Sequence, residues 1–275
     1  MKAQARIPDL GVRRGRGRPI HAFWLWPNVL SLDAPLVAVL WQLLFARCFR
    51  ASPGIAAATL LVAAVWLIYS ADRMLDAWRG AGKRPRHQFY RRYWRAVLPV
   101  WGAVFAAAAF LSWFALPPRL LDRGLWLLAA VALYFATVHV APKWVCKGGK
   151  EALVAILFAL GASAAAWSDI RNAPDLLAVI LFSCLCWINC AAIEQWEGGP
   201  SRFRIGIAAA CVGLAAVLFL HQRRPVLCGA ELASALAFVL LDSRAFRMPP
   251  DLLRVLADAA LLSPIFLLPV AGMRS

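Results

Sequence analysis

Charged residues are scarce in this sequence and almost absent from the centres of its longest apolar runs. Of the 275 residues, 16% are charged and 62% are hydrophobic, whereas about 45–50% of a soluble globular domain is apolar. The apolar runs also lack the alternation of a transmembrane β-strand, because they are continuous and rich in Ala and Leu. These absences exclude a soluble domain and a membrane barrel, and they predict an all-α, polytopic membrane protein.

The sequence lacks a secretory signal and a solvent-facing basic surface. The first 20 residues are basic and contain neither an apolar core nor a cleavage site, so we expect no signal there. The formal net charge is +16, but Lys and Arg fall between the apolar runs rather than along one face. We therefore expect the lipid bilayer as a partner and no nucleic acid.

Nine apolar runs are long enough to be considered as membrane-spanning helices, and Pro or Gly residues separate most of them. Before them, residues 1–21 form a polar, Arg-rich tail that we predict to be disordered, and residues 22–275 form one transmembrane domain. The predicted spans are 29–47, 54–76, 97–115, 124–140, 151–168, 175–195, 204–220, 226–241 and 252–270.

The distribution of Lys and Arg predicts the orientation of these spans. With nine crossings, 22 of the 30 basic residues fall on the side of the N-terminal tail and 8 on the other. Because cytoplasmic loops carry the excess of Lys and Arg, this places the N-terminus in the cytoplasm. We predict an integral protein of a bacterial inner membrane.

Acidic and amide side chains end two of the spans on the predicted cytoplasmic side. Asp72 and Asp76 lie four residues apart, so one helix face carries both. A second group, Asn189, Glu194 and Glu197, ends the sixth span. With the basic loop that contains Lys143 and Lys147, these oxygen ligands suit a Mg²⁺-bound diphosphate.

A purely structural explanation remains open for each acidic group. Asp72 and Asp76 could pair with Arg73 and Arg79 in an interfacial charge cluster, and the two glutamates could simply mark a helix end. The coincidence of both groups on one side of the membrane favours a functional site. Such groups near lipid are rare and usually functional.

The order of these motifs resembles the UbiA superfamily of intramembrane prenyltransferases, which has nine helices and Asp-rich motifs at the cytoplasmic ends of helices 2 and 6. Asp72 and Asp76 match the second and third Asp of the family's first motif, and Arg84-Pro85 matches its downstream dipeptide. The stretches Ser31 to Pro35 and Asp258 to Leu262 also resemble the family. The sequence departs from the family where Ile68-Tyr69 replaces the leading Asn-Asp. No Asp remains in the second motif.

The resemblance implies a Mg²⁺-dependent transfer of an isoprenyl group from a prenyl diphosphate to an aromatic or other lipid-pathway acceptor. It implies Asp72, Asp76 and Lys143 as catalytic residues, Arg73, Arg84, Lys143 and Lys147 as diphosphate-binding residues, and Asp72, Asp76, Asn189, Glu194 and Glu197 as metal ligands. The altered motifs favour one alternative, a non-catalytic UbiA-like protein that binds or transports a polyprenyl lipid. An unrelated transporter is a third hypothesis, which the nearly uncharged span centres disfavour.

Overall fold

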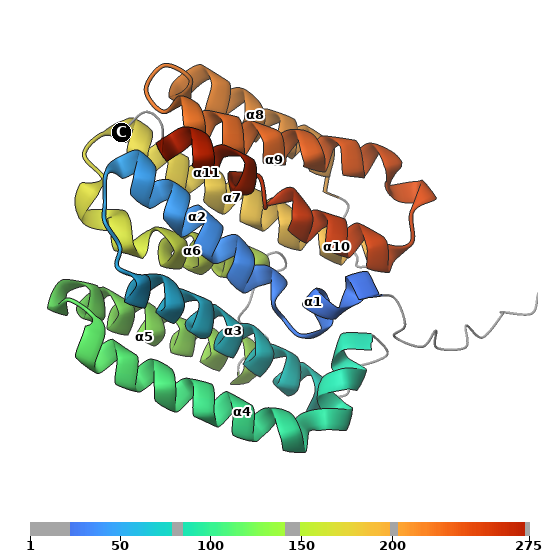
Figure 1. Ribbon diagram of the computed structural model, residues 1–275. Coiled ribbons are helices and arrows are strands. Elements are labelled where there is room, and N and C mark those ends of the chain that lie inside the picture. The colour runs from blue at the N-terminus through green and yellow to red at the C-terminus, as the bar shows by residue number, and fades with distance from the viewer. Residues whose placement is uncertain (1–22, 79–84, 141–148, 199–202, 273–275) are drawn as a thin grey trace, which may run out of the picture.

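The structure is a computed structural model that describes residues 23–78, 85–140, 149–198 and 203–272. Within these ranges the regular structure is entirely helical (Figure 1). The tail predicted for residues 1–21 lies outside them. The α-helices are α1 (Trp26–Val29), α2 (Asp33–Phe49), α3 (Ile55–Trp78), α4 (Pro85–Ala115), α5 (Pro118–Val140), α6 (Gly149–Ser163), α7 (Ala173–Trp196), α8 (Ile205–Leu220), α9 (Pro225–Arg244), α10 (Pro250–Ala260) and α11 (Pro264–Gly272).

Short 3₁₀ segments extend three of these helices, and ordinary capping signals set many of the boundaries. The 3₁₀ segments are Phe23–Leu25, Ala164–Asp169 and Ala245–Arg247. Helix α2 ends at Arg50, which has a left-handed φ of 63°. Asn172 caps α7 by accepting a 3.0 Å hydrogen bond from the backbone N–H of Asp175.

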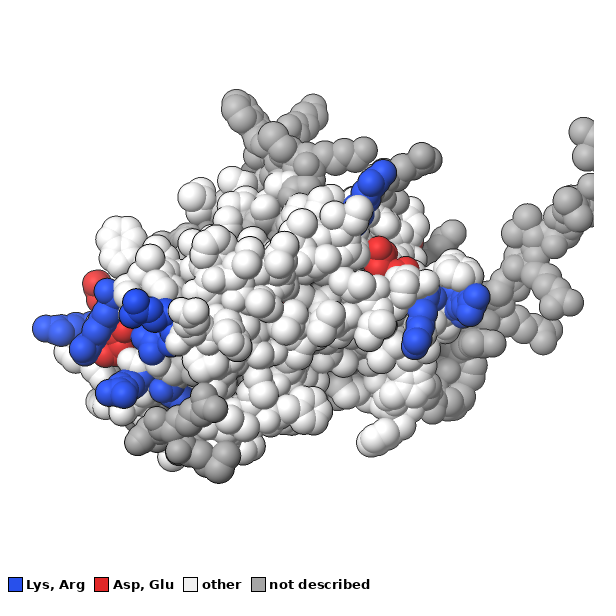
Figure 2. All heavy atoms as spheres, turned by 90° about the horizontal axis from the view of Figure 1, so that it is seen from above, with Lys and Arg blue, Asp and Glu red and all other residues white. Residues whose placement is uncertain are grey.

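Most of the helices are suited to a bilayer. Within the described residues, seven helical stretches are long and apolar enough to cross a membrane. The pair Phe23–Val29 and Asp33–Phe49 would make an eighth crossing if it forms one bent span, while α8 is a shorter apolar helix. Figure 2 views the side of the molecule where α8 and α9 lie, and its charged residues gather at two ends with a broad uncharged belt between them. The prediction of a polytopic helical membrane protein is confirmed.

Helix α7 is the centre of the bundle. Half of the most apolar 18-residue window of α7 is buried within the protein, whereas none of the corresponding window of α4 is. Helices α6, α8, α9 and α10 contact α7 directly, while α3 and α4 pack together in an outer layer (Figure 1). The core includes Trp41 of α2 and Phe182 of α7, whose ring centroids lie 4.1 Å apart. Helix α4 is therefore left to face lipid.

The first and last predicted spans are not the continuous helices that the apolar runs indicated. The first is bent by 76° between α1 and α2, where Ser31 adopts a φ of 60°. The last is interrupted between α10 and α11, because Pro264 has no N–H for a helical hydrogen bond and its ring would clash with the preceding turn. The indole of Trp41 donates a 2.8 Å hydrogen bond to the carbonyl oxygen of Leu261 at this interruption. A side chain of α2 therefore supplies a hydrogen bond to a backbone carbonyl group at the break.

A buried ion pair joins three helix ends on the side of the bundle opposite α1. The guanidinium Nε of Arg224 lies 2.6 Å from Oδ1 of Asp175, whose side chain is fully buried. The same guanidinium lies 5.7 Å from the ring centroid of Phe49 at the end of α2. Because Asp175 begins α7 and Arg224 precedes α9, this contact fixes the ends of α2, α7 and α9 together.

We expect Arg224→Gln to lower the free energy of unfolding in detergent by up to about 3 kcal/mol. The substitution leaves the buried carboxylate of Asp175 without its cation, and the partial exposure of Arg224 limits the loss. Chemical denaturation followed by tryptophan fluorescence would measure it. Arg223→Gln is the matched control, because Arg223 is exposed. Equal losses in both variants would contradict the role assigned to the pair.

Candidate functional site

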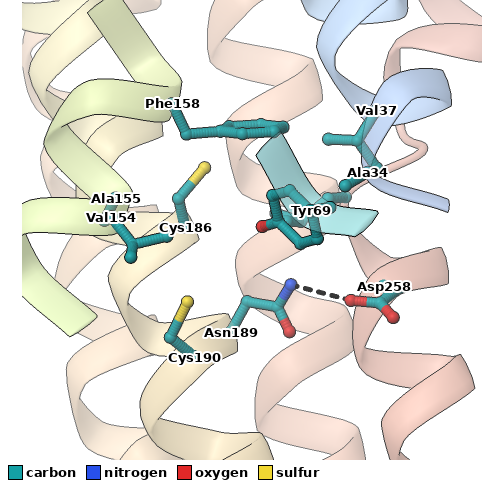
Figure 3. A pocket seen from close by; sticks show the side chains of 11 residues that line it. Ala34, Val37, Tyr69, Val154, Ala155, Phe158, Cys186, Asn189, Cys190 and Asp258 are labelled. Atoms are coloured by element: carbon teal, nitrogen blue, oxygen red, sulfur yellow. Dashed lines mark hydrogen bonds between the residues drawn. The ribbon is translucent and has the colours of Figure 1, made fainter. Parts of the chain in front are cut away.

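A small cavity lies within the bundle, between α2, α3, α6, α7 and α10 (Figure 3). Its volume is about 20 Å³, which is enough for one water molecule or ion. Phe158 and Val37 lie at its apolar end, and Asn189 and Asp258 lie at the other (Figure 3). The lining residues are Ala34, Val37, Tyr69, Val154, Ala155, Phe158, Cys186, Asn189, Cys190, Asp258 and Leu261.

Asp258 accepts hydrogen bonds from two amide side chains beside this cavity. The Nδ2 group of Asn189 donates to Oδ1 of Asp258 at 3.1 Å, and Nδ2 of Asn28 donates to Oδ2 of Asp258 at 3.0 Å. Asn28 also donates to Oδ2 of Asp33 at 2.5 Å, so one amide group bonds the carboxyl groups of both Asp33 and Asp258. The guanidinium of Arg73 donates to the backbone oxygen of Asn28. We call Asn28, Asp33, Arg73, Asn189 and Asp258 the polar cluster.

The polar cluster depends on the bend between α1 and α2. Asn28 belongs to α1 and Asp33 is the first residue of α2, so the turn at Ser31 brings both side chains to the same point. Asn28 and Arg73 are 6% and 5% exposed, so their polar groups need partners within the protein. The cluster thereby ties α1, α2, α3, α7 and α10 together at one end of the bundle.

The acidic pair of α3 lies one turn beyond this cavity. Tyr69 lines the cavity, and Asp72 and Asp76 follow at successive turns of the same helix. Both are half-buried, and with Glu151 of α6 they lie close enough to Tyr134 of α5 for their charges to act on its hydroxyl. The structure therefore adds Glu151 and Tyr134 to the surroundings of the predicted pair.

The second predicted group is partly engaged in contacts within the protein. Asn189 donates to Asp258, as described above, and Oε1 of Glu197 lies 2.9 Å from NH1 of Arg254 in α10. Glu194 is half-buried. In the part of the chain that the structure describes, no three His, Cys, Asp or Glu side chains lie close enough to hold one metal ion. The predicted residues Arg84, Lys143 and Lys147 fall outside the described ranges.

Some oxygen atoms around the cavity retain the capacity to bind a cation. Among the described residues, no hydrogen-bond donor reaches Oδ1 of Asn189 or Oε2 of Glu151, although both atoms are buried. Carboxylate and amide oxygens are the ligand types that Mg²⁺ accepts. Lys150 and Glu151 also lie near Cys190, which lines the cavity. The donor chemistry thus fits a hard cation, although the described acidic residues are not gathered around one point.

Sequence reasoning did not identify several residues of this region. Asn28 lies just outside the first predicted span, and Asp33 and Asp258 belong to stretches for which the sequence indicates only a resemblance to a family pattern. A signal was available, since Asp258 and Glu231 are isolated acidic residues within apolar runs. Glu231 is fully buried in α9, and no described residue hydrogen-bonds to its carboxyl oxygens.

Comparison with protein-family models, with curated proteins and with solved structures gives no match for this chain.

We expect Asp258→Leu to destabilise the protein by about 1–3 kcal/mol. The amide of Asn189 loses its acceptor, and a buried donor without a partner carries the full cost of desolvation. Thermal or chemical unfolding in detergent would measure the loss. Asp251→Leu, which makes the same change at an exposed position of α10, should cost less than about 1 kcal/mol. Equal stability of the Asp258 variant and the wild type would refute the role of the cluster.

Proposed function

We propose that this protein is an intramembrane enzyme of the UbiA type that transfers an isoprenyl group from a prenyl diphosphate to an aromatic or other lipid-pathway acceptor. The observation that carries the proposal is the convergence of α3 and α7 on one cavity, which Tyr69 and Asn189 line together. These helices carry the two motifs on which the resemblance rests. Asp72 and Asp76 continue α3 beyond Tyr69, so the acidic end of α3 faces the same region as the end of α7.

The proposal includes nine membrane crossings and a cytoplasmic N-terminus. Nine successive helical stretches support it, if α1–α2 and α10–α11 each count as one interrupted crossing. Helix α8, with 16 residues, is about 24 Å long, which is short for a crossing. The basic residues between the predicted spans support the orientation.

In this proposal, oxygen atoms from α3, α6 and α7 hold Mg²⁺ and the prenyl diphosphate. Asp72, Asp76 and Glu194 supply carboxylates, and Asn189 and Glu151 supply the buried oxygens that the described residues leave without a donor. When bound, Mg²⁺ supplies Lewis-acid stabilisation of charge on the diphosphate. Glu197 contributes only if its ion pair with Arg254 opens.

In the same proposal, basic residues bind the phosphate oxygens that the metal does not contact. Lys150 begins α6 near Cys190, and Lys143 and Lys147 precede it in the sequence. Arg73 has a different role from the one expected, since it donates to the backbone oxygen of Asn28 and holds the polar cluster. We assign it a positioning role, while Arg84 keeps its predicted role at the diphosphate.

The small cavity requires the site to open before an isoprenyl diphosphate can enter. A volume of about 20 Å³ holds no prenyl chain. The hydrogen bond between Asn189 and Asp258 closes the polar end of the cavity, so its rupture would both widen the site and free the amide for the ligand. Under this proposal, the structure is the closed state of the protein. Substrate entry then requires α10 to shift against α7.

The second candidate function is binding or transport of a polyprenyl lipid without catalysis. One observation favours it, because two of the predicted metal ligands, Asn189 and Glu197, already have partners in α10. If these contacts persist with ligand bound, the metal site is incomplete. An apolar ligand could then bind without Mg²⁺.

We expect detergent-purified protein to bind a non-hydrolysable farnesyl or geranylgeranyl diphosphate analogue only when Mg²⁺ is present. Asp72→Ala with Asp76→Ala should raise Kd by at least about tenfold, since the two carboxylates together contribute more than about 1.4 kcal/mol. Calorimetric titration with and without EDTA measures both effects. Asp122→Ala is the control, because Asp122 is exposed near the start of α5, at the opposite end of the bundle.

Metal-independent binding that ignores the Asp72 and Asp76 substitutions would reject the enzyme and support the lipid-binding alternative. Absence of binding at every chain length tested would reject both. A product formed from the natural diphosphate and an aromatic acceptor would establish the activity itself.

A further inference from the structure

An apolar groove opens on the outer layer of the bundle, away from the cavity. It has a volume of about 480 Å³, which lies within the range of small-molecule sites. Its walls come from the turn between α1 and α2, from Trp66 of α3 and from one face of α4. The lining residues are Leu30, Leu32, Trp66, Phe89, Tyr90, Tyr93, Ala96, Val97 and Val100.

Hydrogen bonds and ring contacts hold the walls of this groove in place. The indole of Trp66 donates to the backbone oxygen of Leu30 at 3.1 Å, and the hydroxyl groups of Ser31 and Tyr90 are 3.0 Å apart. The rings of Trp26 and Phe89 meet edge to face with centroids 6.3 Å apart. The groove is thus formed before any ligand binds, which lowers the entropic cost of binding.

The groove lies on both sides of the point where α4 changes direction. Tyr93 has non-helical backbone angles, with φ of −107° and ψ of 15°, and separates a short initial segment from the long apolar one (Figure 1). From Tyr93 to Val100 the second segment rises by about 10 Å. A chain lying along it would run from the start of the apolar segment toward the middle of the bilayer.

One arginine lies beside the groove without a carboxylate partner. The guanidinium of Arg92 lies 5.6 Å from the ring centroid of Tyr93, which itself lines the groove. Arg92 is exposed. Helix α4 contains no Asp or Glu, and among the described residues no ion pair involves Arg92. The edge of the apolar groove at Tyr93 is therefore cationic.

We propose that this groove binds one anionic phospholipid of the bilayer, with an acyl chain along α4 and its phosphate at Arg92. The combination of groove and charge carries the assignment, because an apolar groove alone would accept any lipid chain, whereas an unpaired guanidinium group selects a negative headgroup. The site shares no residue with the proposed Mg²⁺ and diphosphate ligands. It is a lipid site in addition to the proposed substrate site.

The test is native mass spectrometry of the full-length protein in detergent, titrated with phosphatidylglycerol and, separately, with phosphatidylcholine of the same chains. The wild type should retain one phosphatidylglycerol in preference to phosphatidylcholine. Arg92→Gln should weaken phosphatidylglycerol binding by about fivefold and leave phosphatidylcholine binding unchanged. Ala96→Phe, which fills the groove, should weaken binding of both lipids.

Arg95→Gln is the matched control. Arg95 is exposed on the same helix, and its guanidinium lies 5.5 Å from the ring of Trp94, which does not line the groove. Unchanged selectivity in the Arg92 variant, or an equal loss in the control, would overturn the proposal. Displacement of the lipid by a farnesyl diphosphate analogue would also overturn it, by assigning the groove to substrate. Retained Mg²⁺-dependent diphosphate binding in the Arg92 variant would separate this site from the proposed catalytic one.

Discussion

A polar side chain inside an apolar helical bundle must find its partner within the protein, because lipid offers no hydrogen bonds. The polar cluster meets this requirement by joining five helices at one point. Asn28 can reach Asp258 only because the chain bends at Ser31. The backbone oxygen of Asn28 accepts a hydrogen bond from the guanidinium of Arg73. The bend in the first span and the docking of α10 on α7 are therefore parts of one arrangement.

The same arrangement limits what the cavity can do in this state. Asn189 faces the cavity but gives its amide hydrogen to Asp258, and the space beside it admits one water molecule or ion. A larger ligand has to compete with a hydrogen bond that also stabilises the bundle. Under the proposed function, this competition would couple ligand entry to the position of α10, which the interruption before Pro264 separates from α11.

The two sides of the bundle have different physical environments. Helix α7 is enclosed by other helices, so its polar side chains must bond to residues of those neighbours. Asn189 forms a hydrogen bond with Asp258, and Asp175 forms an ion pair with Arg224. No residue in the most apolar stretch of helix α4 is fully buried, and Arg92 keeps its charge beside a groove that lipid can reach. Selective chemistry is accordingly expected near α7, and recognition of the surrounding membrane is expected near α4.

The sequence by itself determined the class of this protein and the positions of its helices, because continuous apolar runs bounded by Pro, Gly and basic residues have only the helix as a stable form in lipid. It also indicated Asp72, Asp76 and Asn189 as residues at helix ends. Only the tertiary structure decided their partners. Hydropathy records how apolar a segment is and contains no information on which helices meet, so the contact of Asn189 with Asp258, 69 positions apart, and that of Glu197 with Arg254 could not be derived. The breaks at Ser31 and before Pro264 likewise depend on side chains of other helices, because Trp66 donates to the backbone oxygen of Leu30 and Trp41 donates to that of Leu261.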